Sequence, residues 1–266
     1  MSEDSAPDLR DWVEPIRRAE PTWSPHGIRL LDVDPDFGTG LSPTELADVE
    51  QHVVLPTVRL ERGLWEIEQL RQAPGVRGEP RGFLVVAGTV TIDLAIAGQV
   101  CTRLLTPREL VLLDGWEENS IPVRAGWSVL DSAMLAVLDH RVAIIGARWP
   151  GLMDAILKRA AQQVRHALLQ QAISQLPRVE DRLLALLWSI ADRQGVVRAD
   201  GVWVHLPVTH ATLAQMIGAR RPTVSLGLRA LTERGLVRSE GSGWLISPAS
   251  IGEFPPADAR PDIARG

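Results

Sequence analysis

Cysteine is almost absent from the sequence, because Cys101 is the only one in 266 residues. A single thiol cannot build a disulfide framework, a Cys-x-x-Cys metal cage or the usual cysteine-bound iron–sulfur cluster. We expect Cys101 to be a buried core residue, with a redox-reactive thiol as the alternative. Haem ligation by Cys101 or by a histidine has no supporting pattern in the sequence.

Long apolar runs are also missing. No stretch approaches the roughly 18 apolar residues that a membrane-spanning helix needs. The acidic start, MSEDSAPDLRDW, lacks the basic region with which a signal peptide begins. We therefore expect a cytoplasmic protein without a membrane partner.

The patterns of familiar catalytic sites are absent as well. His26, His52 and His140 are isolated, with no His-x-His pair of the kind that metal-dependent β-barrel enzymes use. The sequence contains no nucleophile elbow and no phosphate-cradling glycine loop. We predict a protein that is not an enzyme and that carries no metal or cofactor.

Tyrosine is absent, whereas nine tryptophans are present. Stacked tryptophans would suit a protein that binds single-stranded nucleic acid. Trp188 and Trp244, however, fall on the expected core faces of their elements, so we interpret the tryptophans as packing residues.

Charge is distributed unevenly along the chain. Residues 1–150 carry 14 basic and 23 acidic side chains, a net charge of −9. Residues 151–246 carry 12 basic and 7 acidic side chains, a net charge of +5. The basic part is therefore the candidate for a polyanionic partner, with an ordinary solvated surface as the alternative.

The chain is long enough for two domains with separate cores. We predict a poorly ordered lead-in, a β domain, a long helix, a second small domain and a tail. The predicted boundaries are 1–25, 26–148, 149–176, 177–248 and 249–266.

The region from Val53 to Ile145 is predicted to be an all-β sandwich or barrel, because short apolar runs alternate there with Gly, Pro and Asp. Gly88 and Gly98 mark expected turns or bulges. Ahead of this region, Ser42 begins a short helix with a capping box that is completed by Glu45.

After Pro150 the apolar period becomes helical. Apolar residues recur at spacings of 4, 3, 4 and 3, which predicts a seam for pairing with another helix. The residues of this predicted dimer interface are Met153, Leu157, Ala160, Val164 and Ala167. Packing of this helix on its own domain is the alternative. A second helix follows over 178–194, and residues 196–208 alternate as a hairpin about Asp200-Gly201.

Two helices joined by a tight turn are predicted between Thr209 and Arg234. Thr209 caps the first helix, and Gly218 supplies the turn. The buried faces are expected to hold Leu213, Ala214 and Ile217 on the first helix and Val224, Leu228 and Leu231 on the second. The stretch LVRSEGSGWLI that follows alternates about residues 241–243 and predicts a β-hairpin wing.

The second of these helices begins with two arginines, although the positive end of a helix dipole disfavours cations. We interpret them as groups aimed at an external anion. A helix-turn-helix places the N-terminal end of its second helix in the DNA major groove. Arg221 is predicted to read a guanine, with base-edge contacts from Ser225 and Leu226. Arg220, Thr223 and Arg229 are predicted to contact the DNA backbone, and His210 to touch a phosphate. Thr209 and Pro222 complete the predicted DNA-binding set.

The β-rich domain, the long pairing helix and the sequence LPVTHATLAQMIGARRPTVSLGLRALTERGLV together resemble the CRP/FNR family of bacterial transcription regulators. The resemblance covers most of residues 45–246 in architecture and residues 206–246 in sequence. It implies an α+β chain with an N-terminal β-roll of the double-stranded β-helix type, similar to cyclic-nucleotide-binding domains. It also implies a homodimer formed through the central helix, a two-fold-symmetric operator in double-stranded DNA, and contact with RNA polymerase if the protein is an activator.

The recognition helix departs from the common opening of this family, Arg-Glu-Thr-Val-Ser-Arg. The corresponding residues here are Arg221, Pro222, Thr223, Val224, Ser225 and Leu226. Pro222 cannot accept a hydrogen bond from cytosine, and Leu226 offers only apolar contact, as to a thymine methyl group. The usual operator of the family is therefore not assumed.

The family's cyclic-nucleotide pocket uses a Gly-Glu pair and an Arg-Ser/Thr-Ala stretch. In residues 104–130 only Arg108-Glu109 and Arg124-Ala125 are similar to them. We therefore expect either an unidentified small-molecule effector or none, rather than cyclic AMP in the usual pocket. Two alternatives stay open: a cyclic-nucleotide-responsive regulator with a diverged pocket, and a regulator that acts through protein contacts.

Overall fold

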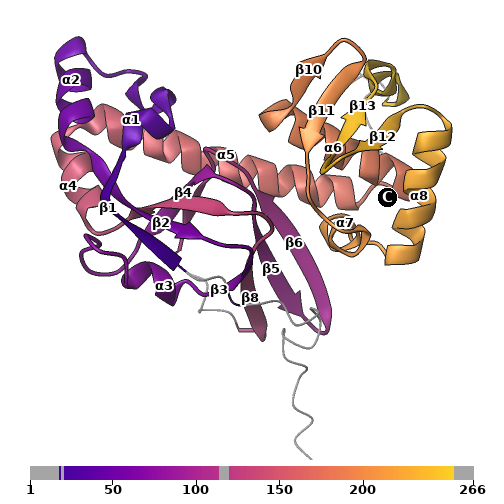
Figure 1. Cartoon of the computed structure of the whole chain (residues 1–266), viewed down its shortest axis with the longest axis horizontal. Helices are drawn as coiled ribbons and strands as arrows, with labels where there is room; N and C mark the ends of the chain where they lie inside the picture. Colours follow the sequence, from indigo (N-terminus) through magenta and orange to yellow (C-terminus); the bar gives the residue numbers. More distant parts are fainter. Residues whose placement is uncertain (1–17, 19–20, 114–119, 255–266) are drawn as a thin grey trace, which may run out of the picture. The chain divides into compact units, whose positions relative to one another are not determined.

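The structure is a computed structural model that describes residue 18 and residues 21–113 and 120–254. The chain divides into two compact units, one running to Leu169 and the other beginning at Gln170 (Figure 1). Helix α5 runs across this division, so the predicted helical segment 149–176 is shared between the two units. Among the described residues, no helix is both long and apolar enough to cross a membrane.

The first unit combines two antiparallel sheets with short helices. Its strands are β1 (Pro21–Arg29), β2 (Val54–Leu60), β3 (Gly63–Trp65), β4 (Gly82–Ala87), β5 (Val90–Ile96), β6 (Gln99–Leu105), β7 (Leu110–Leu112), β8 (Val123–Val129) and β9 (Ala133–Leu138). Its helices are α1 (Leu30–Val33), η2 (Pro35–Gly38), α2 (Pro43–His52), α3 (Glu68–Arg71), α4 (Arg141–Arg148) and α5 (Pro150–Ser174). The capping box predicted for α2 is present between Ser42 and Glu45.

The two sheets pack against each other around an aromatic core. One sheet has the strand order β1-β2-β9-β4-β7 and the other the order β3-β8-β5-β6. Between them, the rings of Trp65, Phe83 and Trp127 lie with their centroids 5.2 to 5.6 Å apart, in edge or tilted arrangements that suit aromatic pairs. These two tryptophans therefore pack in the core, as predicted for the tryptophans in general.

A second core lies on the outer side of the five-stranded sheet. The short helices at the start of the chain, α4 and the first turns of α5 cover Leu84, Ala136 and Leu138 there. A salt bridge from Arg159 of α5 to the fully buried carboxylate of Asp34 holds the N-terminal helices against α5. The beginning of α5 is thus part of the first unit.

Two parts of the first unit differ from the sequence-based prediction. Strand β1 begins at Pro21, inside the segment that was predicted to be a poorly ordered lead-in. Its residues pair with residues of β2 that lie 25 or more positions later in the sequence, and no local pattern predicts such a contact. Residues 141–145, which were predicted to belong to the β region, form the start of α4.

The prediction that Cys101 is buried in the core was wrong, because the residue is exposed. Cys101 pairs with Leu94 near the end of the β5–β6 hairpin, and β6 becomes more exposed toward that end. Strand alternation places Cys101 on the same face of β6 as the buried Leu105. Cys101 lies near the hairpin end of the strand, however, where the side chains are outside the core. Partial burial of the sulfur and the negative charge of Asp93 raise the pKa of the thiol, so little of it is the reactive thiolate.

Asp93 lies on the opposite face of this sheet, among hydroxyl groups. It accepts hydrogen bonds from Thr102 at 2.6 Å, from Ser128 at 3.2 Å and from Thr91 at 3.4 Å. Burial raises the pKa of the Asp93 carboxyl, and the hydroxyl donors offset only part of this effect. The carboxylate is therefore less stable in the folded protein than in the unfolded chain.

Asp93→Asn is expected to make the protein's stability less dependent on pH. A carboxyl whose pKa is raised by folding stabilises the fold below the unfolded-state pKa, and this contribution is lost as the pH rises through the folded-state value. Thermal unfolding should therefore show a smaller loss of stability in the variant than in the wild type between about pH 4 and neutrality. The same pH dependence in both proteins would contradict the assigned effect of Asp93.

The second unit contains a helical trio and a small sheet. Its elements after α5 are α6 (Val179–Gln194), β10 (Val196–Arg198), β11 (Gly201–His205), α7 (His210–Ile217), α8 (Arg221–Glu233), β12 (Val237–Glu240), β13 (Gly243–Ile246) and η3 (Pro248–Glu253). The sheet has the order β10-β11-β13-β12 and contains both hairpins that the sequence predicts. Trp244 is buried, and half-buried Trp188 donates a hydrogen bond to Ser250 at 2.9 Å.

Helix α5 presents two different faces within the first unit. Gln163 and His166 are half-buried and point to the β domain through contacts with Glu109. The other face carries an exposed apolar stripe with spacings of 4, 3 and 4 residues. We call Leu157, Ala161, Val164 and Leu168 the α5 stripe.

The predicted seam overlaps this stripe only in part. Leu157 and Val164 are each 61% exposed, and Ala167 is exposed beside them. Met153 and Ala160 are half-buried, and Met153 packs against the second core of its own unit. Part of the helix therefore packs on its own domain, which is the alternative considered from the sequence. The exposed stripe is left available for another partner.

Candidate nucleic-acid interface

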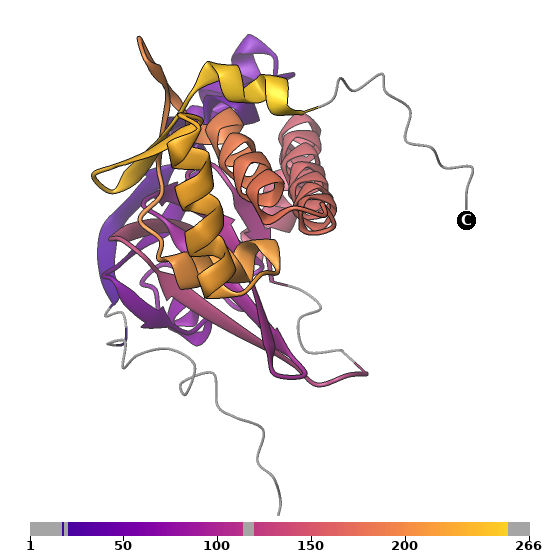
Figure 2. The ribbon, with the colours of Figure 1, turned by 90° about the vertical axis from the view of Figure 1, so that its right-hand side faces the viewer.

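Helices α7 and α8 and the hairpin β12–β13 form the predicted helix-turn-helix with its wing (Figure 2). Thr209 caps α7 by accepting a hydrogen bond from the amide of Thr212 at 3.1 Å. Gly218 ends α7 in the left-handed conformation, with φ of 64° and ψ of 46°. The predicted buried faces of both helices are buried in the structure.

The turn between the two helices is fixed by Arg182 of α6, which sequence analysis did not identify. Its guanidinium donates hydrogen bonds to the carbonyl oxygens of Ile217 at 3.4 Å and Gly218 at 3.2 Å. It also donates to the carbonyl of Leu176 at 2.6 Å. Carbonyls at a helix end lack helical donors, so an arginine from another element satisfies them. In the sequence Arg182 directly follows Glu180 and Asp181 at the start of α6, so nothing local sets it apart from an ordinary surface cation.

Gly227 allows α6 to approach α8 closely. A Cβ atom at residue 227 would lie 3.0 Å from Cδ1 of Leu183 and 3.4 Å from Cγ1 of Val179. Glycine inside a helix costs about 1 kcal/mol relative to alanine, so the close contact of the two helices explains a residue that helix propensity alone disfavours.

Gly227→Val is expected to destabilise the protein by at least about 1 kcal/mol, because its two methyl groups cannot fit against α6. Gly227→Ala should have a smaller effect, since the gain in helix propensity offsets the tight contact. The free energy of unfolding would be measured by chemical denaturation and compared with that of Leu226→Val, which adds a β-branched residue at an exposed position of α8. Equal stability of Gly227→Val and this control would contradict the packing role of Gly227.

The exposed face of α8 carries most of the residues predicted to bind DNA. Arg220 is the N-cap of α8, and Arg221 and Pro222 are its first two residues. Leu226 is 67% exposed, although it is a large apolar side chain. Ser225 is half-buried, and Arg229 is exposed. The structure therefore brings together on α8 and at the start of α7 the nine predicted residues, Thr209, His210, Arg220, Arg221, Pro222, Thr223, Ser225, Leu226 and Arg229.

Arg220 and Arg221 differ from most arginines of the second unit because their side chains make no hydrogen bond or ion pair with any residue in the described part of the chain. Elsewhere in this unit, Arg198 pairs with Glu240 at 2.8 Å, and Arg238 pairs with Asp200 at 3.0 Å. Arg229 pairs with Glu233 at 2.8 Å, but both side chains are largely exposed, so the pair is weak. The start of α8 thus presents two uncompensated cations to solvent.

Ser225 links the two helices of the motif. Its hydroxyl lies 2.9 Å from Nδ1 of His210 and donates a hydrogen bond to the carbonyl oxygen of Arg221 at 3.2 Å. The role of Ser225 as a base-edge contact stays a prediction, and its hydroxyl is already engaged within the protein.

Glu109 of the β domain belongs to one of the two short stretches that are similar to the family's nucleotide-binding motifs, which makes it the place to look for an effector site. Its carboxylate is buried and accepts hydrogen bonds from the amide of Thr106 at 2.6 Å and the hydroxyl of Thr106 at 3.0 Å. His166 of α5 lies 3.4 Å from it and Arg103 of β6 lies 3.6 Å from it. Groups of this chain therefore surround the Glu109 carboxylate.

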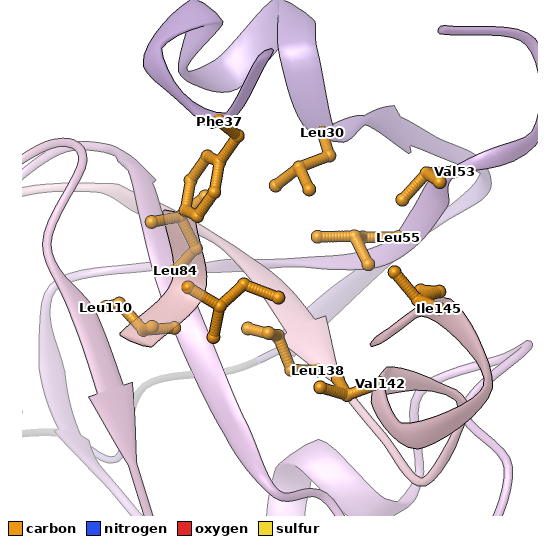
Figure 3. Close-up of a pocket in the computed structure, with 10 residues that line it drawn as sticks. Leu30, Phe37, Val53, Leu55, Leu84, Leu110, Leu138, Val142 and Ile145 are labelled. Carbon is orange, nitrogen blue, oxygen red and sulfur yellow. The ribbon is translucent and has the colours of Figure 1, made fainter. Parts of the chain in front are cut away.

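A small cavity lies elsewhere in the first unit, between the five-stranded sheet and the helices that cover it (Figure 3). Its volume is about 10 Å³, and its lining consists of side chains such as Phe37, Leu84 and Ile145. A cavity of this size has room for about one water molecule, and an apolar lining leaves such a space dry. This cavity therefore offers no site for a polar effector. Within the described residues, no group of three or more His, Cys, Asp or Glu side chains gathers as metal ligands.

Comparison with known proteins agrees with this geometry. Residues 181–248 match the family described as the Crp-like helix-turn-helix domain. They form a Crp-like helix-turn-helix domain. No match was found among curated proteins.

Three solved structures are similar in fold to most of this chain. A variant of CooA from Carboxydothermus hydrogenoformans has a TM-score of 0.58 and 17% identity, over 88% of this chain and 97% of that one. TTHB099, a CRP-family regulator from Thermus thermophilus, has a TM-score of 0.53 and 19% identity, over 73% of this chain and 94% of that one. FixK2 from Bradyrhizobium japonicum has a TM-score of 0.51 and 16% identity, over 64% of this chain and 85% of that one.

The chain has the CRP/FNR fold. Its α+β class, its N-terminal β domain and its C-terminal winged helix are those predicted from the sequence.

Proposed function

We propose that this protein is a cytoplasmic transcription regulator that binds double-stranded DNA as a homodimer through the exposed face of α8. The observation that carries this proposal is the pair of uncompensated cations, Arg220 and Arg221, at the start of α8. Backbone amides and the helix dipole add positive potential at the same place. A polyanion is the partner that this arrangement favours.

Within this proposal, Arg221 reads a base and its neighbours set the position of the helix. A guanidinium can donate two hydrogen bonds to O6 and N7 of guanine, which is the commonest specific contact in the major groove. Arg220, Thr223 and Arg229 contact phosphates, and exposed Leu226 meets a thymine methyl group. The engaged hydroxyl of Ser225 supports a positioning role instead of base reading.

The α5 stripe is the proposed dimer interface. Its spacing of 4, 3 and 4 residues keeps the apolar side chains on one side of the helix, as in a coiled coil. Two copies related by a two-fold axis would place two α8 helices on a DNA site of the same symmetry. We assign no cyclic nucleotide to the β domain, because Glu109 is engaged by the chain itself.

The proposal is tested by selection of random duplex DNA with the purified protein, at several stated salt concentrations, followed by sequencing. We expect a two-fold-symmetric motif with half-sites about one helical turn apart. Affinity for the selected DNA should fall steeply as salt rises, because bound counterions are released from the phosphates. Failure to enrich any sequence, together with no binding of duplex DNA at low salt, would overturn the proposal.

A further inference from the structure

Ser225 lies between a backbone carbonyl and an imidazole, and its hydroxyl has one proton to donate and two lone pairs to accept. The hydroxyl donates a hydrogen bond to the carbonyl oxygen of Arg221 at 3.2 Å. It also lies 2.9 Å from Nδ1 of His210, in a contact whose direction depends on the tautomer of the ring. If the serine proton is used on the carbonyl, the imidazole donates this second hydrogen bond, and the neutral ring then carries its proton on Nδ1.

This tautomer leaves the other ring nitrogen, Nε2, as a hydrogen-bond acceptor whenever the ring is neutral. His210 is exposed as the first residue of α7, and within the described chain its only polar side-chain contact is with Ser225. A DNA phosphate is also only an acceptor, so a neutral His210 cannot donate a hydrogen bond to it. The protonated ring has a proton on Nε2 and a positive charge, and both favour a phosphate.

The neighbours of His210 place it beside the proposed DNA contacts. Its partner Ser225 lies four residues after Arg221 and four residues before Arg229, so these three side chains share one face of α8. Arg221 and Arg229 are the basic groups on that face, and Glu233, paired with Arg229, is the acidic one. Helix α7 contributes no other charged side chain. The contact with Ser225 therefore places His210 beside the exposed face of α8 that is proposed to meet DNA.

We infer that His210 is a pH-dependent phosphate contact, and that Ser225 creates the pH dependence by fixing the proton of the neutral ring on Nδ1. This inference rests on the proposed function. Acidification that protonates the ring would strengthen DNA binding, and binding would be accompanied by proton uptake. Ser225 acts here as a positioning residue, since its effect is exerted through His210.

The tautomer is tested first, without DNA. Long-range ¹H–¹⁵N correlation spectra of the full chain distinguish a neutral imidazole that is protonated on Nδ1 from one protonated on Nε2. We expect the Nδ1 form for His210 in the wild type and a shift toward the Nε2 form in Ser225→Ala. A neutral His210 protonated on Nε2 in the wild type would overturn the inference.

The second test measures affinity for the DNA enriched in the selection experiment, at about pH 6 and about pH 8 and at several salt concentrations. For the wild type, affinity should be several-fold higher at the lower pH. The slope of log affinity against log salt should also steepen by up to about 0.9 for each protomer, as expected for one added phosphate contact. His210→Gln should lose both effects, whereas His26→Gln, an exposed histidine of β1, should keep them.

Ser225→Ala gives the sharpest comparison. Without the serine oxygen, the neutral ring is free to carry its proton on Nε2 and to donate to phosphate, so the dependence of affinity on pH should shrink. Unchanged affinity of the wild type between the two pH values, or full pH dependence in His210→Gln, would overturn the inference and leave the proposed function intact. No DNA binding by the folded wild type at either pH would overturn the proposed function, and the inference with it.

Discussion

Arg221→Ala is expected to weaken binding to the selected operator by about 1–3 kcal/mol and to relax sequence preference at one base pair in each half-site. Arg221 is exposed at the first position of α8 and has no partner in the described part of the chain, so its guanidinium is available to a base. The loss should appear in dissociation constants for the operator and in the motif that the variant selects. Arg221→Lys should also lose specificity, because an ammonium group cannot make the planar two-bond contact with guanine.

The control for this prediction is Arg234→Ala. Arg234 follows the last residue of the same helix and is paired with Glu253, so its removal changes the net charge equally without touching the exposed start of α8. This variant should keep the sequence preference of the wild type. If Arg221→Ala lost the same affinity for operator and for random duplex DNA, Arg221 would be a phosphate contact and not a base reader.

Val164→Asp is expected to convert the protein to monomers. In a parallel pair of α5 helices that pack along the α5 stripe, each stripe residue lies near its counterpart on the partner helix. Two carboxylates would then be buried without cationic partners, which costs several kcal/mol per ion. Sedimentation or light scattering measures the mass directly, and the monomer should bind the two-half-site operator much more weakly than the wild type.

Gln162→Asp is the matched control, because residue 162 is exposed on α5 but lies outside the α5 stripe. It adds the same charge to the same helix and should leave the dimer intact. A dimer that persists in Val164→Asp would place the interface on another surface of the chain. Monomers in both variants would point to general destabilisation of the helix instead of a specific seam.

The winged helix was predictable because its signals are local. Thr209 at a cap, Gly218 at a left-handed turn and the spacing of Val224, Leu228 and Leu231 each depend on residues within about two helical turns. The helix ends predicted from these local patterns lie close to the observed ends of α7 and α8. They could not show that Ser225 faces His210 across 15 residues, because that contact depends on how the two helices pack.

The β domain was less predictable because its strands pair over long separations. The Pro21–Arg29 strand looks like an irregular segment until β2 supplies its hydrogen bonds. Cys101 was expected in the core because free cysteine is usually buried. The sequence does not show where the facing sheet ends, and Cys101 is exposed near the end of its hairpin. Burial of Glu109 was also not visible, since part of what surrounds it comes from α5, more than 50 residues later.

The close contact at Gly227 limits how this regulator can be reprogrammed. A recognition helix grafted from another protein would bring its own residue to position 227, directly against Leu183. A larger side chain there would push α8 outward and move Arg221 relative to the rest of the domain. A helix that is grafted to change the DNA sequence preference therefore needs either a glycine at the position of Gly227 or a smaller residue than leucine at position 183 of this protein.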